Sequence, residues 1–132
     1  MNTNVNVEFV VTGELFNPKD ITRLLNIQPT EEWVKGDNVP NRKIVRSYTC
    51  WCYGVGVEES FDINNQLVKI LGMLNPRREI LKEIKKDYDV EYLVLITIKI
   101  EDDMKPIMSI KLPIIEMMSD IGAEFDIDLY IY

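Results

Sequence analysis

Three segments of the chain alternate apolar and polar residues with a period of two, and no other feature constrains the fold as strongly. The segments are Thr3–Thr12, Val90–Ile100 and Ala123–Tyr132. Successive side chains of a β-strand point to opposite faces of a sheet, so each segment predicts a strand with one apolar face. Val90–Ile100 has Leu93 and Leu95 on its second face as well, which predicts a central position in the sheet. In the last strand we expect Phe125, Ile127, Leu129 and Ile131 to point inward, and Glu124, Asp126, Asp128 and Tyr130 to point outward.

Helix-capping residues and helical periodicity separate these strands. Asn17 followed by Pro18 is typical of an N-cap and the first position of a helix. Apolar residues at helical spacing predict further helices. Four helices are expected: from Pro18 to before Pro29, over residues 60–74, over residues 76–88, and from Pro113 to Gly122. Two additional strands are expected over Lys43–Tyr53 and Ile107–Leu112.

The resulting order is β-α-β-α-α-β-β-α-β. Because the helices are few and the terminal strands alternate cleanly, this order favours an α+β fold over a doubly wound one. We predict a single domain over residues 1–132, with one mostly antiparallel sheet and its helices on one face. The leading topology is a ferredoxin-like arrangement.

Composition excludes several classes of function. The 132 residues include no histidine, which removes histidine-based dyads, general bases and metal ligands. The net charge of −7 argues against nucleic-acid and anionic-membrane binding. No nucleophile motif or convergent acid–base pair is present, so the sequence names no catalytic residue and favours a non-enzymatic role.

The cysteines and the N-terminal region bear on compartment, metals and cofactors. Cys50 and Cys52 stand about 7 Å apart on one strand face, too far for a relaxed disulfide. Two thiols without histidine cannot close a zinc site, so we expect buried free thiols and no metal. Gly54-Val55-Gly56 lacks the third glycine of a dinucleotide-binding turn, so no cofactor is expected. Residues 1–16 lack signal-peptide features and no apolar run is long enough to span a bilayer, which predicts a cytoplasmic protein.

Charge is distributed unevenly along the chain. Residues 69–86 carry six basic and two acidic groups, whereas residues 101–132 carry two basic and eight acidic groups. The basic segment has two interpretations: a solvated helix face with ion pairs three residues apart, or a dipolar surface for a charged partner.

Glu124, Asp126 and Asp128 form a row of carboxylates on one face of the last strand. Such a row suits a cation or a basic protein surface. It also suits the solvated face of an edge strand, which charge protects from aggregation. An edge strand could pair with its own copy, so a homodimer is a further possibility.

The loop over residues 28–42 is the second candidate site, because long loops in compact domains are often functional. It is either a packed plug or a binding loop that uses aromatic and arginine anchors. The candidate residues in and near it are Trp33, Lys35, Asp37, Arg42, Arg46 and Trp51.

Several motifs together resemble a small bacterial family of unknown function. They are Gly13-x-x-Phe16-x-Pro18-x-x-Ile21-Thr22-x-x-Leu25-x-Ile27-x-Pro29-Thr30, then Lys35-Gly36-Asp37, Trp51, and Asp126-Ile127-Asp128-Leu129-Tyr130. The resemblance implies a bacterial cytoplasmic single-domain protein and supplies no activity, cofactor or site residue.

Two hypotheses about function follow from the sequence. The first is a non-catalytic protein-interaction module for a basic partner; by analogy of class it could be an immunity-type protein. The alternative is a small-ligand-binding domain with its pocket under the 28–42 loop.

Overall fold

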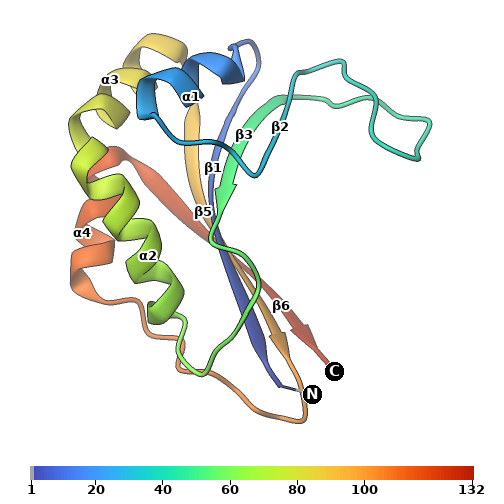
Figure 1. Cartoon of the computed structure of the whole chain (residues 1–132), viewed down its shortest axis with the longest axis vertical. Helices are drawn as coiled ribbons and strands as arrows, with labels where there is room; N and C mark the ends of the chain where they lie inside the picture. The colour runs from blue at the N-terminus through green and yellow to red at the C-terminus, as the bar shows by residue number, and fades with distance from the viewer. Residues whose placement is uncertain (1) are drawn as a thin grey trace.

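The computed structural model describes residues 2–132, so Met1, the first residue of the predicted domain, lies outside the described residues. One mixed sheet carries helices on one of its faces (Figure 1). The strands are β1 (Asn4–Gly13), β2 (Glu31–Trp33), β3 (Thr49–Gly54), β4 (Glu58–Glu59), β5 (Glu91–Ile100) and β6 (Ala123–Ile131). The helices are α1 (Pro18–Leu25), α2 (Asn64–Leu74), the 3₁₀ turn η1 (Asn75–Arg77), α3 (Arg78–Tyr88) and α4 (Leu112–Ile121).

The strand order is β2-β3-β1-β5-β6, and the short β4 pairs with the beginning of β1. β1 is antiparallel to β3 and β5, and β2 is antiparallel to β3. β6 runs parallel to β5 at one edge of the sheet. The predicted α+β class, with a mostly antiparallel sheet and helices on one face, is confirmed. This order does not confirm the ferredoxin-like arrangement.

The core lies between the helices and the alternating residues of β1 and β5. Val7 pairs with Ile96 and Phe9 with Val94 across these strands, and all four side chains are at most 1% exposed. The Tyr92 hydroxyl donates to the Leu81 carbonyl at 2.5 Å, so the one polar atom of this buried ring is satisfied. The helices bury a matching set of apolar residues: Ile21 and Leu25 in α1, Leu67, Ile70 and Leu74 in α2, Leu81 and Ile84 in α3, and Ile114, Met117, Met118 and Ile121 in α4.

The predicted cap of α1 is confirmed. The Asn17 side chain accepts a hydrogen bond from the Lys19 amide at 3.0 Å, and Pro18 occupies the first helical position. The helix ends earlier than expected, at Asn26, which adopts a left-handed conformation with φ of 55°. A left-handed residue satisfies the last carbonyls of the helix, so the helix does not extend to Pro29.

Two predictions on either side of residue 42 are partly wrong: the strand over Lys43–Tyr53 and the loop over residues 28–42. The strand forms only from Thr49, while β2 forms inside the expected loop and pairs with β3. Residues 34–48 make a projecting hairpin, which we call the arm (Figure 1). Ile44 and Val45 are more than half exposed there, because no other strand among residues 2–132 lies beside the arm to bury them.

Two further boundaries differ from the prediction. Ile107–Leu112 is not a strand: Ile107 forms only an isolated bridge with Asp62, and Leu112 already belongs to α4. The segment lies outside the sheet, so its β-branched residues have no ladder to join. The two middle helices are nearly continuous, since η1 joins α2 to α3.

The inward orientation expected for β6 is only partly correct. Ile127, Leu129 and Ile131 lie in register with the buried residues of β5 but are 50%, 47% and 67% exposed. Phe125 packs against the core, because it lies at the end of β6 that the helices reach. The helices cover the interior strands more fully than this edge strand.

Ile96 and Ile127 form a matched pair for testing this difference in cover, because they are register neighbours on the same face. We expect Ile96→Ala to lower the free energy of unfolding by about 2–5 kcal/mol, since it opens a cavity in a fully buried site. Ile127→Ala should cost less than about 1 kcal/mol, because half of that side chain already contacts solvent. Urea unfolding of both variants measures the two losses, and equal losses would contradict the one-sided cover of β6.

Candidate functional site

The face of the sheet opposite the helices, which we call the open face, carries the candidate site. Its side chains are fixed by the register of the strands. One cross-strand row runs from Glu31 through Cys52, Val10 and Leu93 to Glu124. This row is apolar in the middle and acidic at both ends. The remaining members of the face used below are Glu8, Thr12, Trp33, Cys50, Glu91, Leu95, Asp126 and Asp128.

The arm projects on the side of the open face (Figure 1). Its base is built from backbone bonds: the Gly36 amide donates to the Arg46 carbonyl at 2.9 Å, and the Arg46 amide donates to the Asp37 carbonyl at 2.7 Å. Gly36 has a φ of 95°, a value that favours glycine. The Asp37 carboxylate accepts from the Val34 amide at 2.9 Å. Asp37 therefore holds the turn that begins the arm.

Lys35 ties the base of the arm to the segment after β1. Its backbone amide donates to Thr49 Oγ1 at 3.0 Å, and its Nζ lies 2.5 Å from Glu14 Oε2. Arg42 lies at the exposed end of the arm, away from this base. The structure thus separates Lys35 and Asp37, which hold the arm in place, from Arg42, which is free to meet solvent.

Two of the candidate residues, Trp33 and Arg46, lie against each other in the structure. The Arg46 guanidinium lies 3.8 Å from the centre of the Trp33 ring, a cation–π contact, and 4.0 Å from Glu31. Trp33 Nε1 donates to the Tyr48 carbonyl at 2.9 Å, and the two rings meet edge to face at 5.7 Å. Arg46 Nε is buried and has no hydrogen-bond partner among residues 2–132. Of this cluster, Glu31, Trp33 and Tyr48 line one wall of a cleft over the open face of the sheet.

The cleft has a volume of about 320 Å³. Its floor is aliphatic and its walls are aromatic, acidic and thiol-bearing. The lining residues are Glu8, Val10, Thr12, Glu31, Trp33, Tyr48, Cys50, Cys52, Leu93 and Leu95. The loop therefore neither fills the space beside Trp33 nor leaves this ring fully exposed.

The two thiols in the cleft are buried and free, as predicted. Burial raises the pKa of the Cys50 thiol to about 12, with the Glu31 carboxylate adding to the effect. Burial and a hydrogen bond to Glu8 raise the pKa of Cys52 well above its usual range. The Cys52 thiol donates to Glu8 Oε2 at 3.1 Å. Thiols in this state are protonated at neutral pH, which makes them poor nucleophiles and poor metal ligands.

A second hollow of about 430 Å³ adjoins the cleft and shares Thr12 and Tyr48 with it. We call the two together the open-face groove. The charged residues that line it are all acidic: Glu8 and Glu31 in the cleft, and Glu14, Asp89 and Glu91 in the second hollow. Three of these carboxylates lie close to cations of the same chain: Glu14 to Lys35, Glu31 to Arg46 and Glu91 to Lys85. Among residues 2–132, Glu8 and Asp89 have no such ion pair, so they supply most of the field that attracts a cation. Within residues 2–132, no three acidic or cysteine side chains are grouped closely enough to hold a metal ion.

Two other predicted candidates lie away from the groove. Trp51 is on the helix-covered face, fully buried, and its Nε1 donates to Thr22 Oγ1 at 3.0 Å. It is a core residue that anchors β3 to α1. Glu124, Asp126 and Asp128 are exposed on the open face, at the opposite edge of the sheet from Trp33.

Sequence reasoning missed Glu8, Glu31 and Tyr48 as site residues. Glu8 was visible as the acidic member of the polar face of β1, but its proximity to Cys52 depends on how β1 and β3 pair. Glu31 faces the groove only because β2 joins β3. The sequence shows only that carboxylates alternate with apolar residues along the strands. That alternation does not reveal that a cleft forms beside them.

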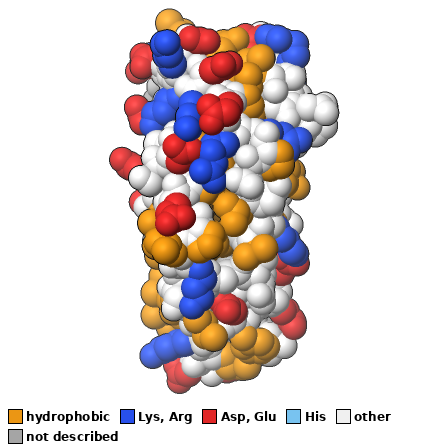
Figure 2. Space-filling model, turned by 90° about the vertical axis from the view of Figure 1, so that its left-hand side faces the viewer, with side chains coloured by type: hydrophobic (Ala, Val, Ile, Leu, Met, Phe, Trp, Pro, Cys, Tyr) orange, Lys and Arg blue, Asp and Glu red, His pale blue; other side chains and the backbone are white. Residues whose placement is uncertain are grey.

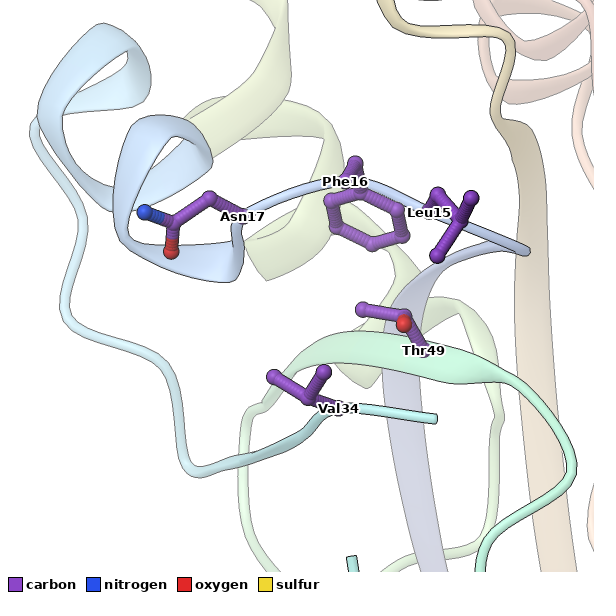
Figure 3. Close-up of a pocket in the computed structure, with 5 residues that line it drawn as sticks. All are labelled: Leu15, Phe16, Asn17, Val34 and Thr49. Atoms are coloured by element: carbon purple, nitrogen blue, oxygen red, sulfur yellow. The ribbon is translucent and has the colours of Figure 1, made fainter. Parts of the chain in front are cut away.

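A separate hollow lies between the start of α1 and the arm (Figure 3). It has a volume of about 430 Å³ and is lined by Leu15, Phe16, Asn17, Val34 and Thr49. Thr49 Oγ1 already accepts from Lys35 and donates to Glu14, and Asn17 Oδ1 caps α1. With these oxygens used, the hollow offers apolar contact and little to orient a ligand.

Residues 3–132 match a family described as Domain of unknown function (DUF4279). The chain belongs to this family. The match confirms the predicted resemblance to a family of unknown function. No curated protein and no solved structure significantly matches this DUF4279 chain.

The basic segment of this DUF4279 chain is largely paired with its own acids and carbonyls. Lys82 lies 2.8 Å and Arg78 3.2 Å from Asp120, and these cations hold the pKa of Asp120 below its usual range. Lys69 lies 2.6 Å from Glu58. Basic and acidic side chains intermingle on the upper part of this helix-side surface (Figure 2). This pairing supports the solvated-helix interpretation. In the described part of the chain, no helix has the length and apolar character needed to cross a lipid bilayer.

Thiol labelling tests whether Cys50 and Cys52 are buried and protonated in the folded protein. A pKa raised from 9.0 to about 12 lowers the thiolate fraction of Cys50 about 1,000-fold at neutral pH. We therefore expect iodoacetamide at pH 8 to modify the folded protein at least about 100-fold more slowly than the urea-unfolded protein. Mass spectrometry of the tryptic peptide measures both rates, and similar rates in the two states would contradict the buried thiols.

Proposed function

We propose that this chain is a non-catalytic protein-interaction module that binds a basic segment of a partner protein on the open face. The observation that carries the proposal is the open-face groove, in which every charged lining residue is a carboxylate. The net charge of −7 has the same sign, so the whole molecule attracts a cationic partner toward this surface.

The centre of the open face supplies apolar contact for such a partner. Val10, Leu93 and Leu95 are only partly buried, although they lie on interior strands of the sheet. Covering them removes apolar surface from water, which provides affinity, while the surrounding carboxylates provide orientation and a faster encounter. Trp33 and Tyr48 stand beside this centre as aromatic contact residues of the kind enriched in binding hot spots.

Three features support a binding role over a catalytic one. The chain contains no histidine. Its cysteine thiols are protonated and buried. The groove carboxylates surround aliphatic side chains, and the thiols among them are held in the protonated form, which is a poor nucleophile. The small size and acidic charge of the chain favour one specific form of this proposal, an immunity-type role. In that role, the basic partner is a toxin met in a bacterial cytoplasm.

Charge neutralisation in the groove tests the proposal with a defined probe. The probe is a fluorescent peptide in which lysine and valine alternate. The triple variant Glu31→Gln, Asp89→Asn and Glu91→Gln should weaken its binding roughly tenfold, taking about 0.5 kcal/mol per exposed charge pair. Fluorescence anisotropy at low and physiological salt measures the affinity, which should fall as salt rises.

The matched control neutralises three exposed helix-side carboxylates, Glu83→Gln, Asp87→Asn and Glu116→Gln, and changes the net charge equally. It should bind the peptide nearly as well as the unaltered protein. If the control loses as much affinity as the groove variant, the peptide is responding to net charge alone and the groove is not the docking site.

The cleft itself favours a second candidate function, the binding of a small cationic ligand. Its volume of about 320 Å³ falls at the lower end of the range of about 300–1,000 Å³ typical of ligand pockets. The Trp33 ring already holds a guanidinium, Arg46, with the Glu31 carboxylate nearby. A ligand with an ammonium group and a short apolar body fits the Glu8 carboxylate and the aliphatic floor.

Pentylammonium tests this second candidate, with pentanoate as the control of opposite charge. We expect pentylammonium to change the Trp33 fluorescence in a saturable manner, because Trp33 forms a wall of the cleft. Glu8→Gln should weaken the binding, while Glu116→Gln should leave it unchanged. Equal responses to pentylammonium and pentanoate, or to neither, would reject the cleft as a cation site.

A further inference from the structure

In the described part of the chain, β6 has an unpaired outer edge along its nine residues, whereas the other terminal strand, β2, has only three residues. β6 ends the strand order and pairs only with β5 among residues 2–132, over nine residues in parallel register. Its second edge therefore presents backbone N–H and C=O groups that no other described strand uses. Such an edge is a template for another strand unless something blocks it.

Both faces of this edge strand are exposed, and they differ in character. Ile127, Leu129 and Ile131 are 50%, 47% and 67% exposed on the helix side. Asp126 and Asp128 are exposed on the open side, with Glu124 one step earlier. An added strand would thus meet aliphatic side chains on one face and carboxylates on the other.

A second copy of the chain is a poor occupant of this edge. In the fully overlapped antiparallel register centred on Ile127, Asp126 of each copy stands opposite Asp128 of the other. A shift of two residues in either direction places Asp126 or Asp128 opposite itself. Like charges directly opposite one another destabilise a strand pair. The charge pattern therefore opposes self-pairing in these three registers, which keep the open faces of both copies on one side of the joined sheet.

The same pattern matches a strand of the opposite character. We propose that the β6 edge accepts an extended segment of a partner protein, in which lysine or arginine alternates with aliphatic residues, as an added strand of the sheet. Its basic side chains would stand opposite Glu124, Asp126 and Asp128, and its aliphatic ones opposite Ile127 and Leu129. The backbone would supply affinity and the alternating side chains specificity. This proposal rests on the proposed function for the basic nature of the partner, and it adds the place and mode of binding.

The test compares two peptides of the length of β6 in which lysine and valine alternate. One has a normal backbone and the other is N-methylated throughout its central residues, which keeps every charge and removes the N–H donors. We expect the normal peptide to bind at least about tenfold more tightly. It should also slow hydrogen exchange at β6 amides, measured by NMR. Asp126→Asn with Asp128→Asn should weaken this binding, and Glu83→Gln with Asp87→Asn should not.

The outcomes separate this proposal from the proposed function. Tighter binding of the normal peptide with slowed β6 exchange supports strand addition. Equal binding of both peptides overturns strand addition and leaves electrostatic docking on the open face standing. Binding of neither peptide overturns both. Equal weakening by the β6 and helix-side variants also overturns the assignment to β6.

A second measurement needs no peptide. Asp126→Lys places a lysine opposite Asp128 twice in the self-paired register, which converts two repulsive contacts into two attractive ones. We expect this variant to self-associate in sedimentation equilibrium. The unaltered protein and Glu116→Lys, which carries the same charge change on α4, should remain monomeric. If Asp126→Lys associates no more than Glu116→Lys, the β6 edge does not pair with another strand and the proposal is rejected.

Discussion

The helices of this protein cover only one face of its sheet, and the candidate site depends on this one-sided cover. On the helix side, the alternating residues of β1 and β5 are fully buried and form the core. On the other side, Val10, Leu93 and Leu95 have only the arm and neighbouring side chains for cover. This half-covered apolar patch lies among polar side chains, and the charged residues that line the groove around it are carboxylates. The candidate site thus combines apolar surface that the helices leave open with acidic groups placed by the strand register.

Features set by local sequence could be predicted, because they depend on residues close together in the chain. The period-two alternation identified β1, β5 and β6, and Asn17-Pro18 identified the start of α1. The arm could not be predicted, because β2 exists only through pairing with β3, across the residues that form the arm. Three residues make too short a strand to show a pattern of their own. The exposure of Ile127 was missed for a related reason: alternation gives the face of a residue but not how far the helices extend over it.

The candidate site shows the same division between local and non-local information. Residue type selected Trp33 and Trp51 equally, and both are strand residues with a hydrogen-bonded indole nitrogen. They differ in the face they occupy: Trp33 pairs with Cys50 on the open face, and Trp51 pairs with Val11 on the buried face. The alternation of β3 separated Trp51 from Cys50 and Cys52 correctly. Because β3 is apolar on both faces, its sequence could not show which face meets the helices.

In the proposed strand addition, the acidic row on β6 has two roles: it prevents self-pairing and it selects a basic partner. Charged residues on an edge strand prevent association with identical strands, since each copy presents the same sign at the same spacing. The spacing that repels a copy also matches a strand of opposite charge, so in the proposed strand addition the same three side chains give both protection against self-pairing and selection of a basic partner. The aliphatic residues on the other face add attraction that does not depend on charge. Without the carboxylates, the exposed Ile127, Leu129 and Ile131 would favour indiscriminate association; in the proposed mode of binding, the carboxylates make the edge discriminate by charge.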